Sequence, residues 1–123
     1  MTTALIIEDN DDNMALITYI LKSGAYDTIA ATTGEEGVDL ALQHKPDVII
    51  LDIQLPGIDG YEVLKRIRAS ENGGSFSIIA MTSFAMTGDR ERLLAAGCNG
   101  YIEKPIDPAV VLPQIQAIIR GTK

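Results

Sequence analysis

The chain has 123 residues, the length of one compact domain, and 46% of them are hydrophobic while only 5% are aromatic. Its formal net charge of −7 argues against sequence-independent binding to nucleic acid, because a phosphate backbone requires a basic surface. A single cysteine, no basic leader and no apolar run of membrane-spanning length lead us to expect one soluble, cytoplasmic domain over residues 1–123.

The first part of the chain predicts a strand followed by a helix. Residues 4–7 are a short apolar run that ends at two acidic residues, which is typical of a buried strand. A helix capped by Asp11 or Asp12 is expected to follow, with Gly24 at its end. The apolar stripe of this helix consists of Met14, Leu16, Ile17, Ile20 and Leu21.

A second, weaker strand is predicted over residues 28–31, followed by a helix over residues 35–44. Thr33 is expected to cap this helix, and Glu36 completes a capping-box pattern with it. The inner face of the helix is expected to consist of Val38, Leu40, Ala41 and Leu42.

The third strand is expected to be the centre of the sheet. Val48–Leu51 is an unbroken apolar run, which is typical of a strand buried on both faces of a parallel sheet. Asp52 follows this run directly and is therefore placed at the carboxyl end of the strand. Ligands of open α/β sheets bind at that edge.

The rest of the chain repeats the alternation of helix and strand. Asp59 is expected to cap a helix with an inner stripe of Val63, Leu64 and Ile67. The elements expected after it are a flexible turn at 72–75, a strand at 76–81, a helix opened by Thr87 or Asp89 and ended by Gly97, and a strand at 99–102. Asp107 is expected to cap the last helix with Pro108 at its first position. Because Pro113 lies inside this helical pattern, either the helix bends there or its first turn is irregular.

Five alternating strands and helices predict right-handed crossovers. The expected fold is therefore a doubly wound α/β domain, in which helices cover both faces of a five-stranded parallel sheet.

Polar side chains follow the strands at the carboxyl edge of this sheet. Glu8 and Asp9 follow the first strand, Asp52 the third, Thr82 the fourth and Lys104 the fifth. Converging carboxylates repel one another unless a cation compensates them, and oxygen ligands of this kind suit Mg²⁺. Acids combined with a hydroxyl and an ammonium group are typical of a phosphoryl-transfer site with a carboxylate nucleophile.

The sequence resembles the receiver domains of two-component response regulators along its whole length. The matching features are the acid pair Glu8-Asp9, the strand-end Asp52, the loop 55–60, Thr82, Tyr101 and Lys104-Pro105. Segments 83–86 and 98–106 are most similar to single-domain receivers of the DivK type and to the receivers of hybrid sensor kinases. The resemblance implies a flavodoxin-like sheet with the strand order 2-1-3-4-5.

The resemblance also implies a role for each matched position. Asp52 is expected to be the phosphoacceptor, and Lys104 to contact the phosphoryl group. Thr82 and Tyr101 are expected to be the switch hydroxyl and the switch aromatic, and the peptide bond before Pro105 is expected to be cis. The expected ligands of Mg²⁺, or of Mn²⁺, are Glu8, Asp9, Asp52 and the backbone carbonyl of Gln54.

Two positions depart from the commonest pattern of the family. Glu8 stands where Asp is more usual, and its longer arm would change how the metal's waters are held. Ser83 stands where Ala is common and would slightly narrow the access to the site. Gln54 and Phe84 occupy positions that tune the phosphoryl lifetime in this family.

The implied function is a phosphorelay switch and not a conventional enzyme, since self-catalysed phosphoryl transfer and autodephosphorylation would be its only reactions. The donor is expected to be a sensor histidine kinase or a histidine phosphotransfer protein. Phosphorylation would change the binding of an unknown downstream protein at the last two helices and the fifth strand. The chain would either be a stand-alone receiver that acts by binding a partner protein, or be the receiver domain of a longer protein. It is expected to be a monomer or a phosphorylation-dependent dimer.

Two other protein classes use a similar sheet. A haloacid-dehalogenase-type phosphatase requires a second acid two residues after its nucleophile, and Gln54 stands there. A flavodoxin-like electron carrier requires a phosphate-binding loop after the first strand, where this chain has four acidic or amide residues at 8–11.

Single residues of the site also have purely structural explanations. Acids after the first strand stabilise a helix N-terminus, and Lys104 alone would be a solvated lysine. Cys98 is expected to be inert packing, and His44 a favourable cation at a helix C-terminus.

Overall fold

The computed structural model describes residues 2–70, 73–83 and 87–121. Strands and helices alternate along this part of the chain, as expected. Their bounds are β1 Thr3–Ile7, α1 Asp11–Ser23, β2 Asp27–Ala31, α2 Gly34–His44, β3 Val48–Asp52, α3 Gly60–Arg68, a 3₁₀ turn η1 Gly73–Ser75, β4 Ser77–Thr82, α4 Thr87–Ala95, β5 Gly100–Glu103 and α5 Val111–Gly121.

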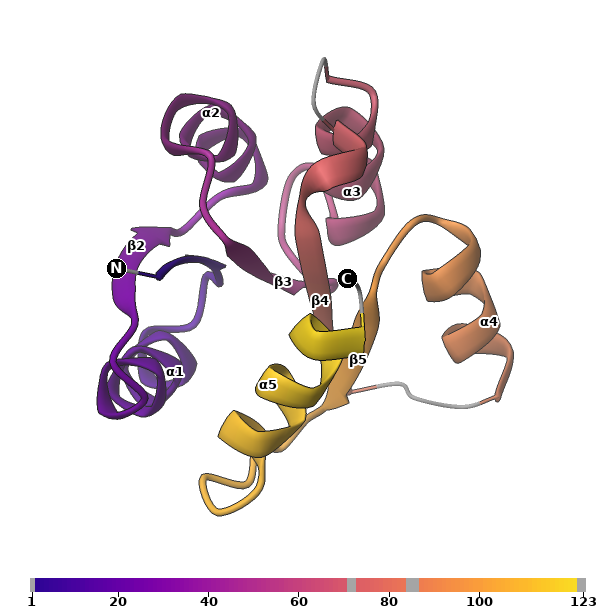
Figure 1. Cartoon of the computed structure of the whole chain (residues 1–123). Helices are drawn as coiled ribbons and strands as arrows, with labels where there is room; N and C mark the ends of the chain where they lie inside the picture. The colour runs from indigo at the N-terminus through magenta and orange to yellow at the C-terminus, as the bar shows by residue number, and fades with distance from the viewer. Residues whose placement is uncertain (1, 71–72, 84–86, 122–123) are drawn as a thin grey trace.

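The sheet has five parallel strands in the order β2-β1-β3-β4-β5, which confirms the predicted fold class and strand order (Figure 1). β3 is the central strand, and its Ile50 lies opposite Ile6 of β1 and Ile79 of β4. All five residues of β3 are buried, as its continuous apolar run predicts.

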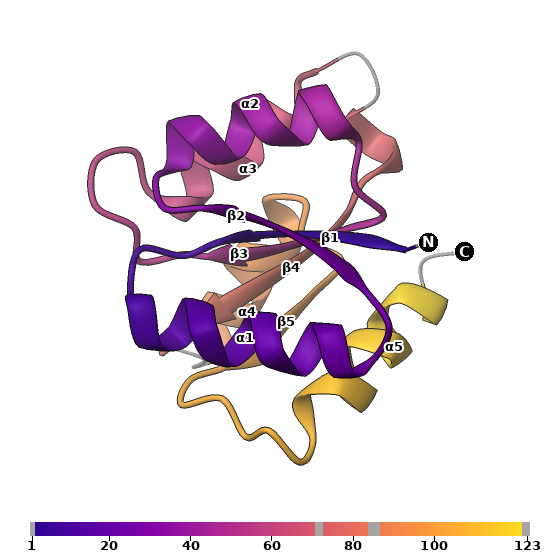
Figure 2. The same cartoon turned by 90° about the vertical axis from the view of Figure 1, so that its left-hand side faces the viewer.

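Helices cover both faces of the sheet, with α2 and α3 on one face and α1 and α5 on the other (Figure 2). Alternate residues of the strands point to opposite faces, so each face has its own core. Leu51 packs with α2 and α3, together with Leu93 of α4, whereas Ile50 packs with α1 and α5. None of the helices in the described ranges combines the length and apolar character that crossing a membrane requires.

The N-terminal cap of α1 differs from the prediction. The cap is Asn10, whose side chain accepts a hydrogen bond from the N–H of Asn13 at 2.9 Å. Asp11 and Asp12 lie inside the first turn, where their charges still favour the positive end of the helix dipole. The predicted C-cap at Gly24 is confirmed, although the left-handed conformation belongs to the next residue, Ala25 (φ 67°).

Helix α2 packs on the sheet through small residues. The predicted cap is confirmed, because Thr33 Oγ1 accepts a hydrogen bond from the N–H of Glu36 at 3.2 Å. Gly37 lies directly against Ile7, and Ala41 is fully buried. Leu42 was expected on the inner face, but it is 42% exposed, because the buried positions Gly34, Gly37 and Ala41 place it on the outer side.

Helix α5 begins later than expected. Pro108 lies in a turn over residues 108–110, and the preceding Asp107 Oδ1 accepts a hydrogen bond from the N–H of Ala109 at 2.9 Å. The helix starts only at Val111. Pro113 therefore lies in the first turn of the helix, where its missing N–H has no helical acceptor to lose. This outcome is the irregular start that was one of the two predicted alternatives.

Two further predictions concern the segment around β4. Residues 73–75 form a 3₁₀ turn where a flexible turn was expected, whereas Asn72 lies outside the described residues. α4 begins at Thr87, and Gly97 beyond its end has a positive φ of 113°. Cys98 is buried, and burial raises the pKa of its thiol to about 11, which agrees with the expected inert packing role.

Candidate functional site

The three acids at the carboxyl edge of the sheet lie together in the structure. Glu8 and Asp9 follow β1 and Asp52 ends β3, and one carboxylate oxygen from each lies within 4.8 Å of the others. Glu8 is 0% exposed and Asp52 is 2% exposed, whereas Asp9 is exposed to solvent. The central position of β3 between β1 and β4 explains this convergence, because it aligns the ends of strands that are far apart in sequence.

Lys104 lies between the two buried acids. Its Nζ is 3.1 Å from Oε1 of Glu8 and 3.1 Å from Oδ1 of Asp52. Lys104 follows β5, and its backbone N–H donates to the carbonyl of Thr82 at 2.8 Å, which fixes the start of its side chain at the sheet edge. The peptide bond between Lys104 and Pro105 is cis, as expected.

Burial and mutual repulsion make the charged form of Glu8 unfavourable. Burial is the largest influence and raises the pKa of Glu8 to about 7, with a further contribution from the carboxyl group of Asp52. Lys104 and the N–H of Asn10, which lies 3.3 Å from Glu8 Oε2, oppose this rise. Burial is the largest single influence on the pKa of Lys104 and lowers it. Glu8 and Asp52 together outweigh burial, so the pKa of Lys104 is raised above its ordinary value.

The donor set fits a hard divalent cation. Oε1 of Glu8 is buried and lies close to Lys104, but it accepts no hydrogen bond of good geometry. A buried carboxylate oxygen without a hydrogen bond is costly, and a bound cation would satisfy it. Three carboxylates from two neighbouring strands, one of them open to solvent, are suitable ligands for Mg²⁺, which retains several of its waters.

Thr82, at the end of β4, is linked to Gln54. Gln54 Nε2 donates to Thr82 Oγ1 at 3.1 Å, and the N–H of Ser83 donates to Gln54 Oε1 at 3.4 Å. The N–H of Gln54 also donates to Asp52 Oδ1 at 3.0 Å. Gln54 therefore connects the predicted phosphoacceptor with the predicted switch hydroxyl, a side-chain contact that sequence analysis did not anticipate.

Tyr101 lies on β5 opposite Ala80, which precedes Thr82 by two residues on β4. The structure places it half-buried against the core that faces α2 and α3, with the guanidinium of Arg90 5.4 Å from its ring centre. Tyr101 also borders a cavity of about 280 Å³ between β5 and α5. Sequence analysis did not single out Arg90, because an arginine on an exposed helix surface gives no signal of a contact with another element.

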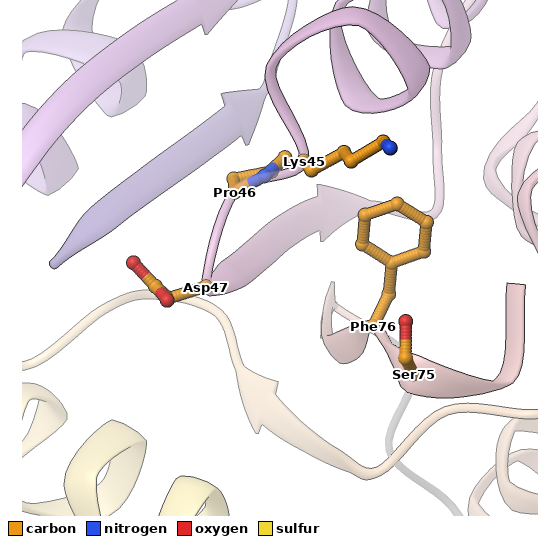
Figure 3. Close-up of a pocket in the computed structure, with 5 residues that line it drawn as sticks. All are labelled: Lys45, Pro46, Asp47, Ser75 and Phe76. Carbon is orange, nitrogen blue, oxygen red and sulfur yellow. The ribbon is translucent and has the colours of Figure 1, made fainter. Parts of the chain in front are cut away.

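A second cavity lies at the amino-terminal ends of the strands, on the side of the sheet away from the acids (Figure 3). It measures about 290 Å³ and is formed where the chain enters β3 and β4. Asp47 Oδ2 in its wall accepts a hydrogen bond from the N–H of Thr3 at 2.7 Å and so supports the start of β1. The cavity is thus remote from the acids, and it is lined by Lys45, Pro46, Asp47, Ser75 and Phe76.

The structure thus brings Glu8, Asp9, Asp52 and Lys104 together and places Thr82 beside them through Gln54. The phosphoacceptor role of Asp52, the metal-ligand and switch roles, and the phosphoryl contact of Lys104 stay predictions. Phe84, which was expected to influence the phosphoryl lifetime, lies outside the described residues.

Comparisons with known proteins agree on one family. The family model of the response regulator receiver domain matches residues 4–116. The polar-differentiation response regulator DivK of Brucella ovis is 44% identical over 104 residues, which are 85% of this chain and 85% of that protein.

Solved structures give the same result. The receiver domain of a sensor histidine kinase from Pseudomonas aeruginosa PAO1, with a magnesium ion coordinated in its active site cleft, has a TM-score of 0.87 and 38% identity, covering 97% of this chain and 98% of that one. A two-component response regulator from Clostridium difficile has a TM-score of 0.87 and 28% identity, covering 98% and 97% of the two chains.

Proposed function

This chain belongs to the family of response regulator receiver domains, and from that membership we propose that Asp52 accepts a phosphoryl group from a phosphohistidine donor. Receiver domains are signalling switches. The observation that carries the proposal is the position of the Asp52 carboxylate, buried at a strand end and in contact with Lys104 at 3.1 Å. A buried acid with an ammonium partner, in a cluster of further acids, is typical of a functional site.

In the proposed reaction a carboxylate oxygen of Asp52 attacks the phosphorus atom. The P–O bond forms as the P–N bond to the donor histidine breaks, and the imidazole takes up a proton. Gln54 N–H and Lys104 hold Asp52 Oδ1 from two sides, at 3.0 and 3.1 Å, and so fix the orientation of the carboxylate. Fixed orientation of the reacting group lowers the entropic part of the barrier.

Glu8, Asp9, Asp52 and the backbone carbonyl of Gln54 are the proposed ligands of Mg²⁺, or of Mn²⁺. When bound, the cation supplies positive charge that compensates the acids and the phosphoryl oxygens. The relative from Pseudomonas aeruginosa, which has a magnesium ion in its active site cleft, supports this part of the proposal. Lys104 would supply a second positive charge to the phosphoryl group, since it is already placed beside Asp52.

Thr82 and Tyr101 are the proposed switch residues. Thr82 would give up its hydrogen bond with Gln54, and its hydroxyl would donate a hydrogen bond to the phosphoryl group. The Tyr101 ring would move into the space that becomes free. The surface of α4, β5 and α5 would change as a result, and a downstream protein would bind it differently. Such a change is a shift between two existing conformations, not the formation of a new fold.

The donor in this proposal is a sensor histidine kinase or a histidine phosphotransfer protein. Residues 1–123 would act as one receiver domain in the cytoplasm, with self-catalysed phosphoryl transfer and autodephosphorylation as the only reactions. A monomer, or a dimer that forms on phosphorylation, is compatible with the proposal.

The proposal is tested by intact-protein mass spectrometry after incubation with acetyl phosphate, with and without Mg²⁺. We expect one phosphoryl adduct that requires Mg²⁺ and disappears in Asp52→Asn. Asp39→Asn is the matched control, because Asp39 is an exposed acid of α2 and its substitution should leave the adduct unchanged. An adduct that persists in Asp52→Asn would show that another residue is the nucleophile. A folded wild-type protein without any adduct would show that the domain signals by binding alone.

A further inference from the structure

In its described part, helix α4 buries little apolar surface against the rest of the molecule. Of its side chains that the structure describes, residues 90–95, Leu93 is the buried one, while Leu94 is 50% exposed. The helix lies beside β5, the strand at the edge of the sheet (Figure 1). Two arginines of this helix make contacts with other elements, Arg90 with β5 and Arg92 with Tyr61 of α3.

Arg90 contacts two residues of β5 at the same time. Its guanidinium carbon lies 5.4 Å from the centre of the Tyr101 ring, and its Nη2 lies 3.7 Å from Oε1 of Glu103. Tyr101 and Glu103 are two residues apart on the strand and so share a face of the sheet, while Ile102 between them packs into the core of the other face. The ion pair with Glu103 thus keeps the guanidinium where it also covers the aromatic ring.

The position of this contact connects it with the site. Glu103 lies opposite Thr82 in the sheet, and Tyr101 lies opposite Ala80. Arg90 consequently joins α4 to the part of β5 that neighbours the end of β4. A movement of the Tyr101 ring away from α4 would separate the ring from the guanidinium and remove their attraction.

We propose that Arg90 is a positioning residue that holds the Tyr101 ring in the half-buried position seen here, beneath the guanidinium, and so opposes the switch. This inference rests on the proposed function, in which the ring moves into the space that Thr82 leaves when Asp52 is phosphorylated. Arg90 stabilises the resting conformation only, because its contact with the ring is lost in the other one. A ligand that binds the switched conformation must overcome the free energy by which this contact favours the resting conformation.

The expected size of the effect is modest. Cation–π contacts at exposed sites and half-exposed ion pairs are both weak, and Arg90 and Glu103 have side chains that are 49% and 59% exposed. Removal of the guanidinium should raise the population of the switched conformation by about two- to fivefold. The apparent affinity for a ligand selective for that conformation should rise by the same factor.

The test uses the full chain, with beryllofluoride and Mg²⁺ as a phosphoryl analogue that is titrated by calorimetry. Arg90→Gln should bind beryllofluoride about two- to fivefold more tightly than the wild type. Arg92→Gln is the matched control, because Arg92 is on the same helix and its guanidinium lies over a different ring, that of Tyr61, at 4.0 Å. An increase that is equal in Arg92→Gln would overturn the proposal, since it would reflect a general loosening of α4.

A second variant tests whether Arg90 acts through the ring. In a Tyr101→Leu background, Arg90→Gln should leave the beryllofluoride affinity unchanged, and an undiminished effect there would contradict the proposal. In protein with ¹³C-labelled tyrosine, the Tyr101 ring signal of Arg90→Gln should shift toward its position in the beryllofluoride complex, which a merely structural role would not cause. Arg90→Lys should restore part of the wild-type behaviour. An unchanged affinity in Arg90→Gln would overturn this inference alone, whereas a wild type that binds no beryllofluoride would overturn the proposed function with it.

Discussion

The raised pKa of Glu8 predicts an unusual dependence of stability on pH. Without a metal ion, folding raises the pKa of Glu8 from an ordinary value of 4.5 to about 7, mainly because the side chain is buried. Between these two values the folded state binds more protons than the unfolded state, so the contribution of Glu8 to stability is greatest below pH 4.5 and is lost as the pH rises through 7. Between pH 5 and pH 8 the contribution of Glu8 falls by about 2 to 3 kcal/mol.

The substitution Glu8→Gln should remove this dependence, because the amide is similar in shape and does not titrate. Urea unfolding in the presence of a chelator, at pH 5 and at pH 8, measures the change in both proteins. Glu35→Gln, which removes an exposed acid from the first turn of α2, controls for the loss of one negative charge. A decline with pH that is equally large in Glu8→Gln would refute the assignment of the raised pKa to this carboxyl group.

The same protonation equilibrium predicts how Mg²⁺ binds. A metal ion requires Glu8 in its charged form, so binding should release about half a proton per ion at pH 7 and weaken about tenfold between pH 8 and pH 6. Calorimetric titrations with Mg²⁺ in buffers of different ionisation enthalpy measure the proton release. Binding without proton release at pH 7 would show that Glu8 is already ionised in the free protein.

Two further predictions concern the scaffold that places the site. Asp59→Ala should lower the free energy of unfolding by about 1 kcal/mol in urea titrations, because Asp59 Oδ1 accepts the N–H of Glu62 at 3.0 Å and so caps α3; a change near zero would mean that water replaces the cap. Gly37→Ala should cost about 1 to 3 kcal/mol, since an added Cβ would lie 2.5 Å from Cδ1 of the fully buried Ile7. Gly74→Ala, which meets no atom within 4 Å, is the control, and an equal loss in that variant would contradict the packing argument.

The sequence was sufficient for features that depend on neighbouring residues. The apolar run Val48–Leu51 predicted the buried central strand, because a continuous run of this kind is stable only where both faces are covered. Thr33 and Asp59 were predicted correctly as caps, since a cap bonds an N–H only three residues ahead. The predicted N-terminal cap of α1 was wrong. Several side chains that can cap a helix follow one another there, and the backbone conformation at Asn10 selects among them.

The composition of the candidate site was also predictable, because acids directly after apolar strands are costly unless they have a function. The resemblance to receiver domains then supplied a role for each residue, and the family assignment is confirmed. The late start of α5 was not predictable in the same way. A proline inside a helical pattern allows either a bent helix or an irregular start. The turn that follows Asp107 decides between these two alternatives.

Only the tertiary structure decided how strongly the site residues influence one another. Lys104 is far from Glu8 and Asp52 in sequence, and the distances of 3.1 Å between them result from the order of the strands in the sheet. The raised pKa of Glu8 has the same origin, because burial and the charge of a neighbouring strand are properties of the assembled sheet. The contact between Arg90 and Tyr101 likewise joins two elements whose relative position no local pattern encodes. Residue types are written in the chain, whereas their distances and electrostatic coupling arise when distant segments pack together.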